Sequence, residues 1–447
     1  MVWEDEPDRP EGIASVVPVL HWLPRYERQW FRNDLFAALT VAAFAVPNLM
    51  AFSQLAGLPP QYGLYAGIGA GIAYFLFGSI KRLSIGPSAS QAIMVASVIS
   101  VMVPVSDYMV GDVLMEEEYY LRYVSLAVTA SFMVGVIFLL ARVFKLGFII
   151  NLIPVPVFRG FMAGLGLTII MSQLPKVLGV AGTHGDFFTR LFDLLGQLGD
   201  TNVHTLGLGL LLLVLLFALN ARFKRLPNPL IVVVLSIIIM TFTDLADQGV
   251  QVVGQIPRGL PSPAIPELNA GDVRSLLPLA LGLFLLSFVE TTSIGKQLES
   301  KHAYRMDPDQ ELIALGGANI GSALFQGFPV SASVSRSFLN DMAGARTQMS
   351  SLLMALVLAA VVVWLTGTLT NMPVVVMGVL IIVAVAGIID LGELNRIRTI
   401  SQSGFLVAMT SLGCVLAFGV LEGILIGVGI SFLYVMYRIA TPEMSTL

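Results

Sequence analysis

Runs of about 20 apolar residues recur from Leu35 to Val435 and are separated by short polar segments. Each run is long enough for a helix to cross a hydrocarbon core about 30 Å thick. The composition agrees, because 56% of the 447 residues are hydrophobic, 12% are charged and the mean hydropathy is +0.83. These values lie far from those of a soluble globular protein. The sequence therefore predicts an all-α protein with many membrane-spanning helices, embedded in a lipid bilayer.

We predict roughly fourteen spans from hydropathy. The proline-rich loop Asp247 to Arg274 divides them into two halves of about seven. Two halves with an odd number of spans each have opposite orientations in the membrane, as in the inverted repeats of many transporters. The predicted spans are 35–55, 60–79, 87–103, 122–141, 148–173, 204–220, 228–246, 276–295, 309–323, 329–342, 349–367, 373–389, 402–416 and 419–437.

Positive residues follow every second predicted span, whereas the acidic segment Asp107 to Glu118 lies on the opposite side. By the positive-inside rule, the basic loops and both termini are cytoplasmic, and we place the protein in the bacterial inner membrane. The first 33 residues lack the apolar region and cleavage site of a signal peptide. The basic residues are Lys81, Arg82, Arg142, Lys145, Arg222, Lys224, Arg225, Lys296, Lys301, Arg305, Arg346, Arg396, Arg398 and Arg438.

Several classes of protein are disfavoured. The net charge of −4 and the lack of a basic patch interleaved with aromatic residues argue against a nucleic-acid partner. Cys414 is the only cysteine and the four histidines fall in predicted loops or termini, so we predict neither a metal site nor a cofactor. Motifs of intramembrane enzymes, such as HExxH, GxSxG or paired catalytic aspartates, are absent.

One helix in each half is interrupted, at Ser84–Gln91 and at Phe325–Arg336. Each segment places a proline before small hydroxyl residues, where a short apolar helix begins, and free N–H groups at a helix N-terminus attract anions. The alternative is that Gly and Pro merely kink these helices. Interrupted spans at matching positions of two halves predict a substrate site between them. The predicted anion contacts are Ser88, Ala89, Ser90, Ser331, Ala332 and Ser333.

Two charged residues are predicted within the spans. Arg336, about two turns into the tenth span, would attract an anion, although an ion pair or a reach toward a cytoplasmic vestibule would also accommodate it. Glu290 in the eighth span would bind the coupling proton, because its charge depends on burial and on Arg336. A sodium ion held by Glu290, Thr291 or Thr292 is the rival, and a structural bridge to Arg336 is the other alternative.

The first span adds two candidates. Asn48 and Phe52 lie four residues apart on one helical face, so an amide and a ring edge would line the same cavity. Aromatic packing is the alternative for Phe52. Asp307 and Glu311, at the start of the ninth span, are predicted to be structural because acids complement a helix N-terminus.

Three segments, Leu55–Tyr65, Asp307–Gly316 and Phe328–Arg336, resemble the sulfate permease family of anion transporters. Gly344–Gln348 and Ile256–Pro261 are similar to further motifs of that family. The resemblance covers about residues 30–442. It implies seven plus seven inverted repeats, a core and a gate domain, and two half-helices with short strands that meet at the midplane. Substrate is then bound between the facing N-termini of the third and tenth helices. The resemblance also implies an elevator-like movement of the core.

The resemblance further implies a domain division and a cytoplasmic STAS domain after the last span. The chain stops at Leu447, so this domain is either absent or cut from the sequence, which leaves homodimerisation open. Asn48 stands where the family commonly has Gln. The expected parts are an N-terminal cytoplasmic segment (1–33), the core domain (34–145 and 251–368), the gate domain (146–250 and 369–438) and the start of a linker (439–447).

Together these features predict a secondary active transporter for a small oxyanion such as sulfate, bicarbonate or a dicarboxylate, coupled to H⁺. The resemblance supports proton coupling, because an acid at the position of Glu290 accompanies ion-coupled transport in the family. An uncoupled exchanger or channel and a Na⁺-coupled bicarbonate symporter are the alternatives. A nucleobase–cation symporter of the same fold type is disfavoured by Arg336 and by the motifs.

Overall fold

The computed structural model describes residues 12–110, 113–147, 155–182, 185–223, 227–266, 268–302, 306–387 and 389–420, and isolated positions up to 429. Helices occur at every predicted span from 35–55 to 402–416. The predicted span 419–437 lies mostly outside the described residues, as does the predicted linker 439–447. Among the described residues, six helices are long and apolar enough to cross a membrane: Arg28–Leu55, Glu116–Val143, Pro156–Leu178, Val203–Arg222, Ala270–His302 and Met349–Leu369.

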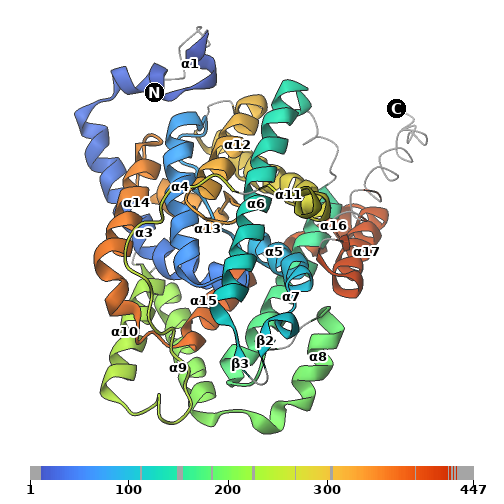
Figure 1. Cartoon of the computed structure of the whole chain (residues 1–447). Helices are drawn as coiled ribbons and strands as arrows, with labels where there is room; N and C mark the ends of the chain where they lie inside the picture. Colours follow the sequence, from blue (N-terminus) through green and yellow to red (C-terminus); the bar gives the residue numbers. More distant parts are fainter. Residues whose placement is uncertain are drawn as a thin grey trace.

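The chain is almost entirely helical (Figure 1). The first half contains α1 (Ile13–Val16), α2 (Val19–Trp22), α3 (Arg28–Leu55), α4 (Gln61–Phe77), α5 (Ala89–Met102), α6 (Glu116–Val143), α7 (Val155–Leu178), α8 (Phe187–Gly196), α9 (Val203–Arg222) and α10 (Asn228–Phe242). The second half contains α11 (Ala270–His302), α12 (Pro308–Leu324), α13 (Val334–Met342), α14 (Met349–Ala360), α15 (Val374–Ala386), α16 (Leu391–Ile400) and α17 (Gln402–Phe418). The strands are β1 (Ile85–Gly86), β2 (Met109–Val110), β3 (Val113–Leu114) and β4 (Ser331–Ala332).

The helices pack in two groups. In one, α12 contacts α4 and α6, α14 contacts α3 and α4, and α11 contacts α6; in the other, α7 contacts α9, α15 and α17 (Figure 1). Helices α3 and α5 also contact the second group, through α10, α15 and α7. Glycines permit the tightest approaches, as is common between membrane helices. A Cβ at Gly69 of α4 would lie 2.1 Å from the Gly321 carbonyl oxygen of α12, and one at Gly160 of α7 would lie 1.9 Å from the Ala408 oxygen of α17.

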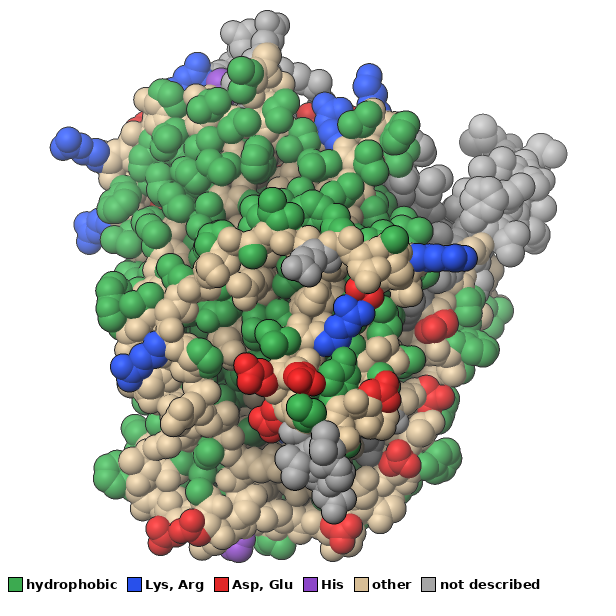
Figure 2. Space-filling model, viewed as in Figure 1, with side chains coloured by type: hydrophobic (Ala, Val, Ile, Leu, Met, Phe, Trp, Pro, Cys, Tyr) green, Lys and Arg blue, Asp and Glu red, His purple; other side chains and the backbone are tan. Residues whose placement is uncertain are grey.

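Large apolar side chains remain on the outer faces of several helices. Examples are Phe36, Leu211, Phe217 and Trp364, each more than half exposed. In the view of Figure 2, hydrophobic side chains cover most of the upper part of the visible face, and acidic side chains gather in the lower part. An apolar exterior of this extent is expected of helices in contact with lipid.

The two interrupted segments meet as a short antiparallel sheet in the middle of the molecule. β1 pairs with β4, with Ile85 opposite Ala332 and Gly86 opposite Ser331. Each strand leads directly into a short helix, α5 after β1 and α13 after β4. The predicted paired interruptions are thus confirmed, and the two strands hold the starts of both half-helices together.

The predicted position of Arg336 within its helix was wrong. The tenth span was predicted from residue 329, but α13 begins at Val334, so Arg336 lies in the first turn and not two turns in. The cause is the pairing of β4 with β1, which keeps the backbone extended through Ala332. A long-range strand partner of this kind leaves no local signal in the sequence.

Two short amphipathic helices, α8 and α16, were not predicted. Each has 10 residues, and hydropathy averaged over about 19 residues does not detect helices of that length. Helix α8 exposes Phe188, Phe192 and Leu195 while burying Leu194. Helix α16 buries Leu394 and Ile397 against the helices of its own group.

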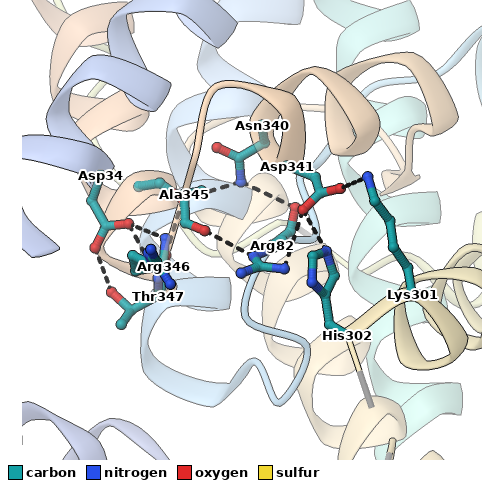
Figure 3. A network of polar contacts seen from close by, with 10 residues as sticks. Asp34, Arg82, Lys301, His302, Asn340, Asp341, Ala345, Arg346 and Thr347 are labelled. Carbon is teal, nitrogen blue, oxygen red and sulfur yellow. Dashed lines mark hydrogen bonds and ion pairs between the residues drawn. The ribbon is translucent and has the colours of Figure 1, made fainter. Parts of the chain in front are cut away.

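A polar network connects the end of α13, the end of α11 and the residues before β1 (Figure 3). The Asp341 carboxylate near the end of α13 accepts from Lys301 Nζ at 2.6 Å, lies 2.7 Å from His302 Nε2, and pairs with Arg82 Nη1 at 3.2 Å. Lys301 and His302 end α11, and Arg82 precedes β1. Arg82 and Lys301, which the charge pattern predicts to be cytoplasmic, therefore meet at the same carboxylate.

Candidate functional site

Hydroxyl groups from both half-helices surround the carboxyl of Glu290, which α11 supplies. Ser90 Oγ donates to Glu290 Oε1 at 2.6 Å and Ser331 Oγ donates to Oε2 at 2.8 Å. Ser88 Oγ lies 2.9 Å from Ser90 Oγ and 3.2 Å from Ser331 Oγ. Glu290 is only partly buried, whereas the three serines are at least nine-tenths buried. The two interrupted segments and the eighth predicted span thus meet at one carboxyl.

The two threonines predicted beside Glu290 differ in orientation. Thr291 Oγ1 accepts from Ala332 N at 3.4 Å and so faces β4. Thr292 Oγ1 donates to the Phe288 carbonyl oxygen of its own helix. Both are fully buried. Of the predicted ion-coupling residues, Glu290 and Thr291 therefore contact the interrupted segments, and Thr292 turns its hydroxyl back to α11.

The N–H groups at the two half-helices are used differently from the prediction. Ala332 N donates to Thr291, and Ser333 N donates to the Ser84 carbonyl oxygen at 3.2 Å, so neither is free for an anion. Ala89 is the first residue of α5, and Ser88 Oγ caps this helix by accepting from Gln91 N. At α13 the N-cap residue Ser333 forms no side-chain capping bond. The uncapped N–H groups at the first turn of α13 remain available to an anion.

Arg336 lies in that first turn and is buried, with 1% of its surface exposed. Its Nη1 donates to the Pro87 carbonyl oxygen at 2.7 Å, just before α5. Its Nε and Nη2 have no hydrogen-bond partner among the described residues. A guanidinium buried in this way costs several kcal/mol unless an anion compensates it.

The structure does not contain the alternative bridge between Glu290 and Arg336. Within the described part of the chain, the ion pairs involve neither residue, and Glu290 is bonded to serines instead. Asp307 and Glu311 are structural, as predicted: Asp307 caps α12, and Glu311 accepts from Ser79 N and from the Tyr74 hydroxyl.

The first-span candidates lie on α3, which packs against both α5 and α13. Asn48 Nδ2 donates to the Phe44 carbonyl oxygen of its own helix at 2.7 Å, and Asn48 and Phe52 are both buried. The Asn48 amide is thus bonded within α3 and not to the half-helices. Leu49 between them reaches β1, because its Cδ2 would lie 3.8 Å from a Cβ at Gly86.

Two residues of the site were missed by the sequence analysis. Ser335, exposed in the first turn of α13, precedes Arg336 and lies where the uncapped N–H groups are. Gln91 on α5 is fully buried, and neither end of its amide has a hydrogen-bond partner among the described residues. Both belong to the two interrupted segments, so the helix-start signal that located those segments would also have found them.

The fold and the site define a class of protein. Two interrupted helices meet at a buried arginine and an uncapped helix N-terminus, which is the arrangement of a membrane transporter for anions. The comparison with known proteins gives the family. The sulfate permease family model matches residues 31–411, and the chain belongs to that family.

Relatives from distant organisms are similar over nearly the whole chain. A probable sulfate transporter of Mycobacterium tuberculosis (strain CDC 1551) is 35% identical over 434 residues, which cover 97% of this chain and 75% of the relative. Solute carrier family 26 member 6 of Homo sapiens is 30% identical over 453 residues, covering 97% of this chain and 59% of that protein. The family and these relatives are transporters, and the protein is therefore not an enzyme.

Solved structures support the same fold. The murine solute carrier 26 family member A9 anion transporter, in an inward-facing state, superposes with a TM-score of 0.89 at 27% identity, covering 97% of this chain and 74% of that one. The transmembrane domain of the cyanobacterial bicarbonate transporter BicA superposes with a TM-score of 0.76 at 23% identity, covering 91% and 98%.

Proposed function

We propose that the protein is a secondary active transporter that carries a small oxyanion inward across the bacterial cytoplasmic membrane together with a proton. Sulfate is the first candidate, because the mycobacterial relative is named a probable sulfate transporter. Bicarbonate and a dicarboxylate are the other candidates. Cytoplasmic termini follow from the positive-inside pattern of the loops.

The observation that carries this proposal is Arg336. Its guanidinium is buried, two of its nitrogens are unpaired among the described residues, and it lies in the first turn of a helix whose N-terminus is uncapped. An oxyanion between α13 and α5 would accept from these groups. The Ser333 and Ser335 hydroxyls add weak neutral donors beside the positive charge of Arg336, a balance that suits a protein that must release its ligand, whereas the Ser331 hydroxyl is already donated to Glu290.

Glu290 is the proposed coupling group. Its carboxyl shares Ser90 and Ser331 with the two half-helices, so it occupies the same polar cluster as the proposed anion site without pairing with Arg336. A protonated Glu290 and a bound anion would leave the site close to neutral, which is the least costly state in a low-dielectric interior. Sodium bound by Glu290 and Thr291 remains the second candidate, because both present oxygen atoms to the same cluster.

The proposed movement is that of an elevator, in which the core (34–145 and 251–368) carries the site past the gate (146–250 and 369–438). The packing supports this division, because the half-helices contact core helices α3 and α11, while α7, α9, α15 and α17 contact one another. The association of two copies of the chain as a homodimer is possible in this arrangement but is not needed for the proposed site.

The test is uptake of radiolabelled sulfate, bicarbonate and fumarate into proteoliposomes, with an inward proton gradient, an inward sodium gradient or neither. We expect proton-driven accumulation of sulfate, and loss of that accumulation in Glu290→Gln with anion binding retained. If accumulation instead requires the inward sodium gradient, the coupling ion is sodium and not the proton. If anion flux is independent of both gradients in wild type and in Glu290→Gln, the protein is an exchanger or a channel, and the proposal is overturned.

A further inference from the structure

Gln91 is a buried polar residue that the proposed mechanism does not yet use. It lies in the first turn of α5, and its side chain is fully buried. Neither Nε2 nor Oε1 has a hydrogen-bond partner among the described residues. A buried amide with both ends unpaired is unfavourable, so a native structure keeps one only where it serves a purpose or gains a partner in another state.

The surroundings of Gln91 identify that partner. Its amide lies within interaction range of the Glu290 carboxyl, although no hydrogen bond of normal geometry forms. The preceding residue, Ser90, already donates to Glu290 Oε1, and α5 packs against α11. The backbone N–H of Gln91 is held by Ser88 Oγ, which fixes the start of the side chain while its amide remains unpaired.

Other charged groups are engaged elsewhere. Helix α5 and strand β4 carry no titratable residue. On α6, Arg122 pairs with Asp272, and on α12, Glu311 is bonded to Ser79 and Tyr74. Helix α13 carries two charged residues: Arg336 donates to Pro87, and Asp341 pairs with Lys301, His302 and Arg82. Within the described residues, Gln91 is therefore an uncommitted hydrogen-bonding side chain next to the Glu290 carboxyl. The buried Ser287 hydroxyl, three residues before Glu290 on α11, also has no hydrogen-bond partner, but it is shorter and lacks the separate donor and acceptor of an amide.

An amide can serve both protonation states of a carboxyl, because it carries two N–H donors and one carbonyl acceptor. Ser90 and Ser331 each donate their single hydroxyl proton to Glu290, so further protonation of Glu290 requires an acceptor for the new O–H or a rearrangement of these serines. Gln91 Oε1 is such an acceptor, and Gln91 Nε2 is a third donor for the charged form.

We propose that Gln91 positions the coupling proton on Glu290 by presenting Nε2 to the carboxylate and Oε1 to the protonated carboxyl. The amide itself neither gains nor loses a proton, which enters and leaves through solvent. This inference rests on the proposed function of Glu290 as the coupling group. It makes Gln91 a positioning residue and predicts that it affects the pH dependence of transport more than the affinity for the anion.

The test compares the pH profile of proton-driven sulfate uptake in wild type, Gln91→Met, Gln91→Asn and Glu290→Gln. Met retains the length of Gln without donor or acceptor. Because hydrogen bonds to a charged group are the stronger ones, the loss of Nε2 costs the carboxylate more than the loss of Oε1 costs the carboxyl. We therefore expect the midpoint of the pH profile to move upward by about one pH unit in Gln91→Met and by less in Gln91→Asn. The KM for sulfate should change by less than about threefold in both variants.

Ser97→Ala serves as the matched control on the same helix, because Ser97 bonds only to the Met94 carbonyl oxygen, and we expect its midpoint to equal that of wild type. If Gln91→Met does not fold, Gln91→Asn tests the proposal by itself, and an upward shift of its midpoint would support the role of Gln91. An unchanged midpoint in both Gln91 variants, together with a flat profile in Glu290→Gln, would overturn the role of Gln91 and leave the coupling role of Glu290 intact. A Glu290→Gln profile identical to wild type would overturn both.

Discussion

A buried arginine, for which the described residues supply no acidic partner, is the residue on which the proposed anion binding depends. Three of its five N–H donors, one on Nε and two on Nη2, have no hydrogen-bond partner among the described residues, and the first turn of α13 adds uncapped N–H groups beside it. The positive charge of Arg336 and the positive end of the helix dipole therefore act on the same volume. Glu290 belongs to the neighbouring serine cluster and forms no ion pair with Arg336, so the proposed function has an anion beside Arg336 and a proton on Glu290 bind at separate groups.

We predict that Arg336→Ala weakens sulfate binding about 10- to 100-fold, the range expected for losing hydrogen bonds to a charged group. Arg336→Lys should recover part of the affinity, because it restores the charge without the planar fork. Equilibrium binding to the purified protein measures both. Arg346→Ala is the control: Arg346 is exposed, and its backbone N–H, which the substitution retains, makes the bond to Asp34. Equal affinity in Arg336→Ala and wild type would remove Arg336 from the site.

At the scale of elements, hydropathy and helix-start signals were sufficient to find the spans and the two interrupted segments, because these signals are local. The start of α13 was misplaced, since β4 is held extended by β1, which lies about 245 residues earlier in the chain. The orientation of Thr292 toward Phe288 and the unpaired amide of Gln91 also depend on packing between α5, α11 and β4. Residue types could thus be assigned to the site from sequence, but not the direction of each side chain.

The contact of α13 with α11 and with the residues before β1 depends on one carboxylate. Asp341 faces Lys301, His302 and Arg82, and only 2% of its side chain is exposed (Figure 3). We predict that Asp341→Asn lowers the free energy of unfolding by roughly 2 kcal/mol, because three donors lose their charged acceptor. Thermal unfolding in detergent would show a lower Tm. Glu393→Gln is the matched control, since its pair with Arg396 is largely exposed and should contribute less than about 0.5 kcal/mol. Equal Tm shifts in the two variants would contradict this role.

At the scale of the whole molecule, the segment 251–264, which we call the strap, joins the two groups of helices. At its beginning, Val253 N donates to the Met372 carbonyl oxygen and Val252 pairs with Pro373, just before α15. Further along, the Tyr65 hydroxyl donates to the Gly259 oxygen, and Ala264 N donates to the Leu324 oxygen, on α4 and α12. One end of the strap is therefore held by the proposed gate and the other by the proposed core.

Under an elevator movement the strap must change its backbone angles between these two attachments. Gly254 and Gly259 lie there at φ +78° and +108°, with no atom near enough to obstruct a Cβ. Alanine at such angles costs about 1–2 kcal/mol, so Gly254→Ala and Gly259→Ala should slow maximal transport by up to about tenfold while leaving anion affinity unchanged. Gly344→Ala is the matched control, because Gly344 has φ +90° and equally open surroundings but lies between α13 and α14, which both contact α3 of the proposed core. Uptake rates normalised to the amount of folded protein measure the effect. If all three variants lose the same fraction of the rate, the strap does not respond to a relative movement of the two groups of helices, and this result would contradict an elevator movement that displaces the strap.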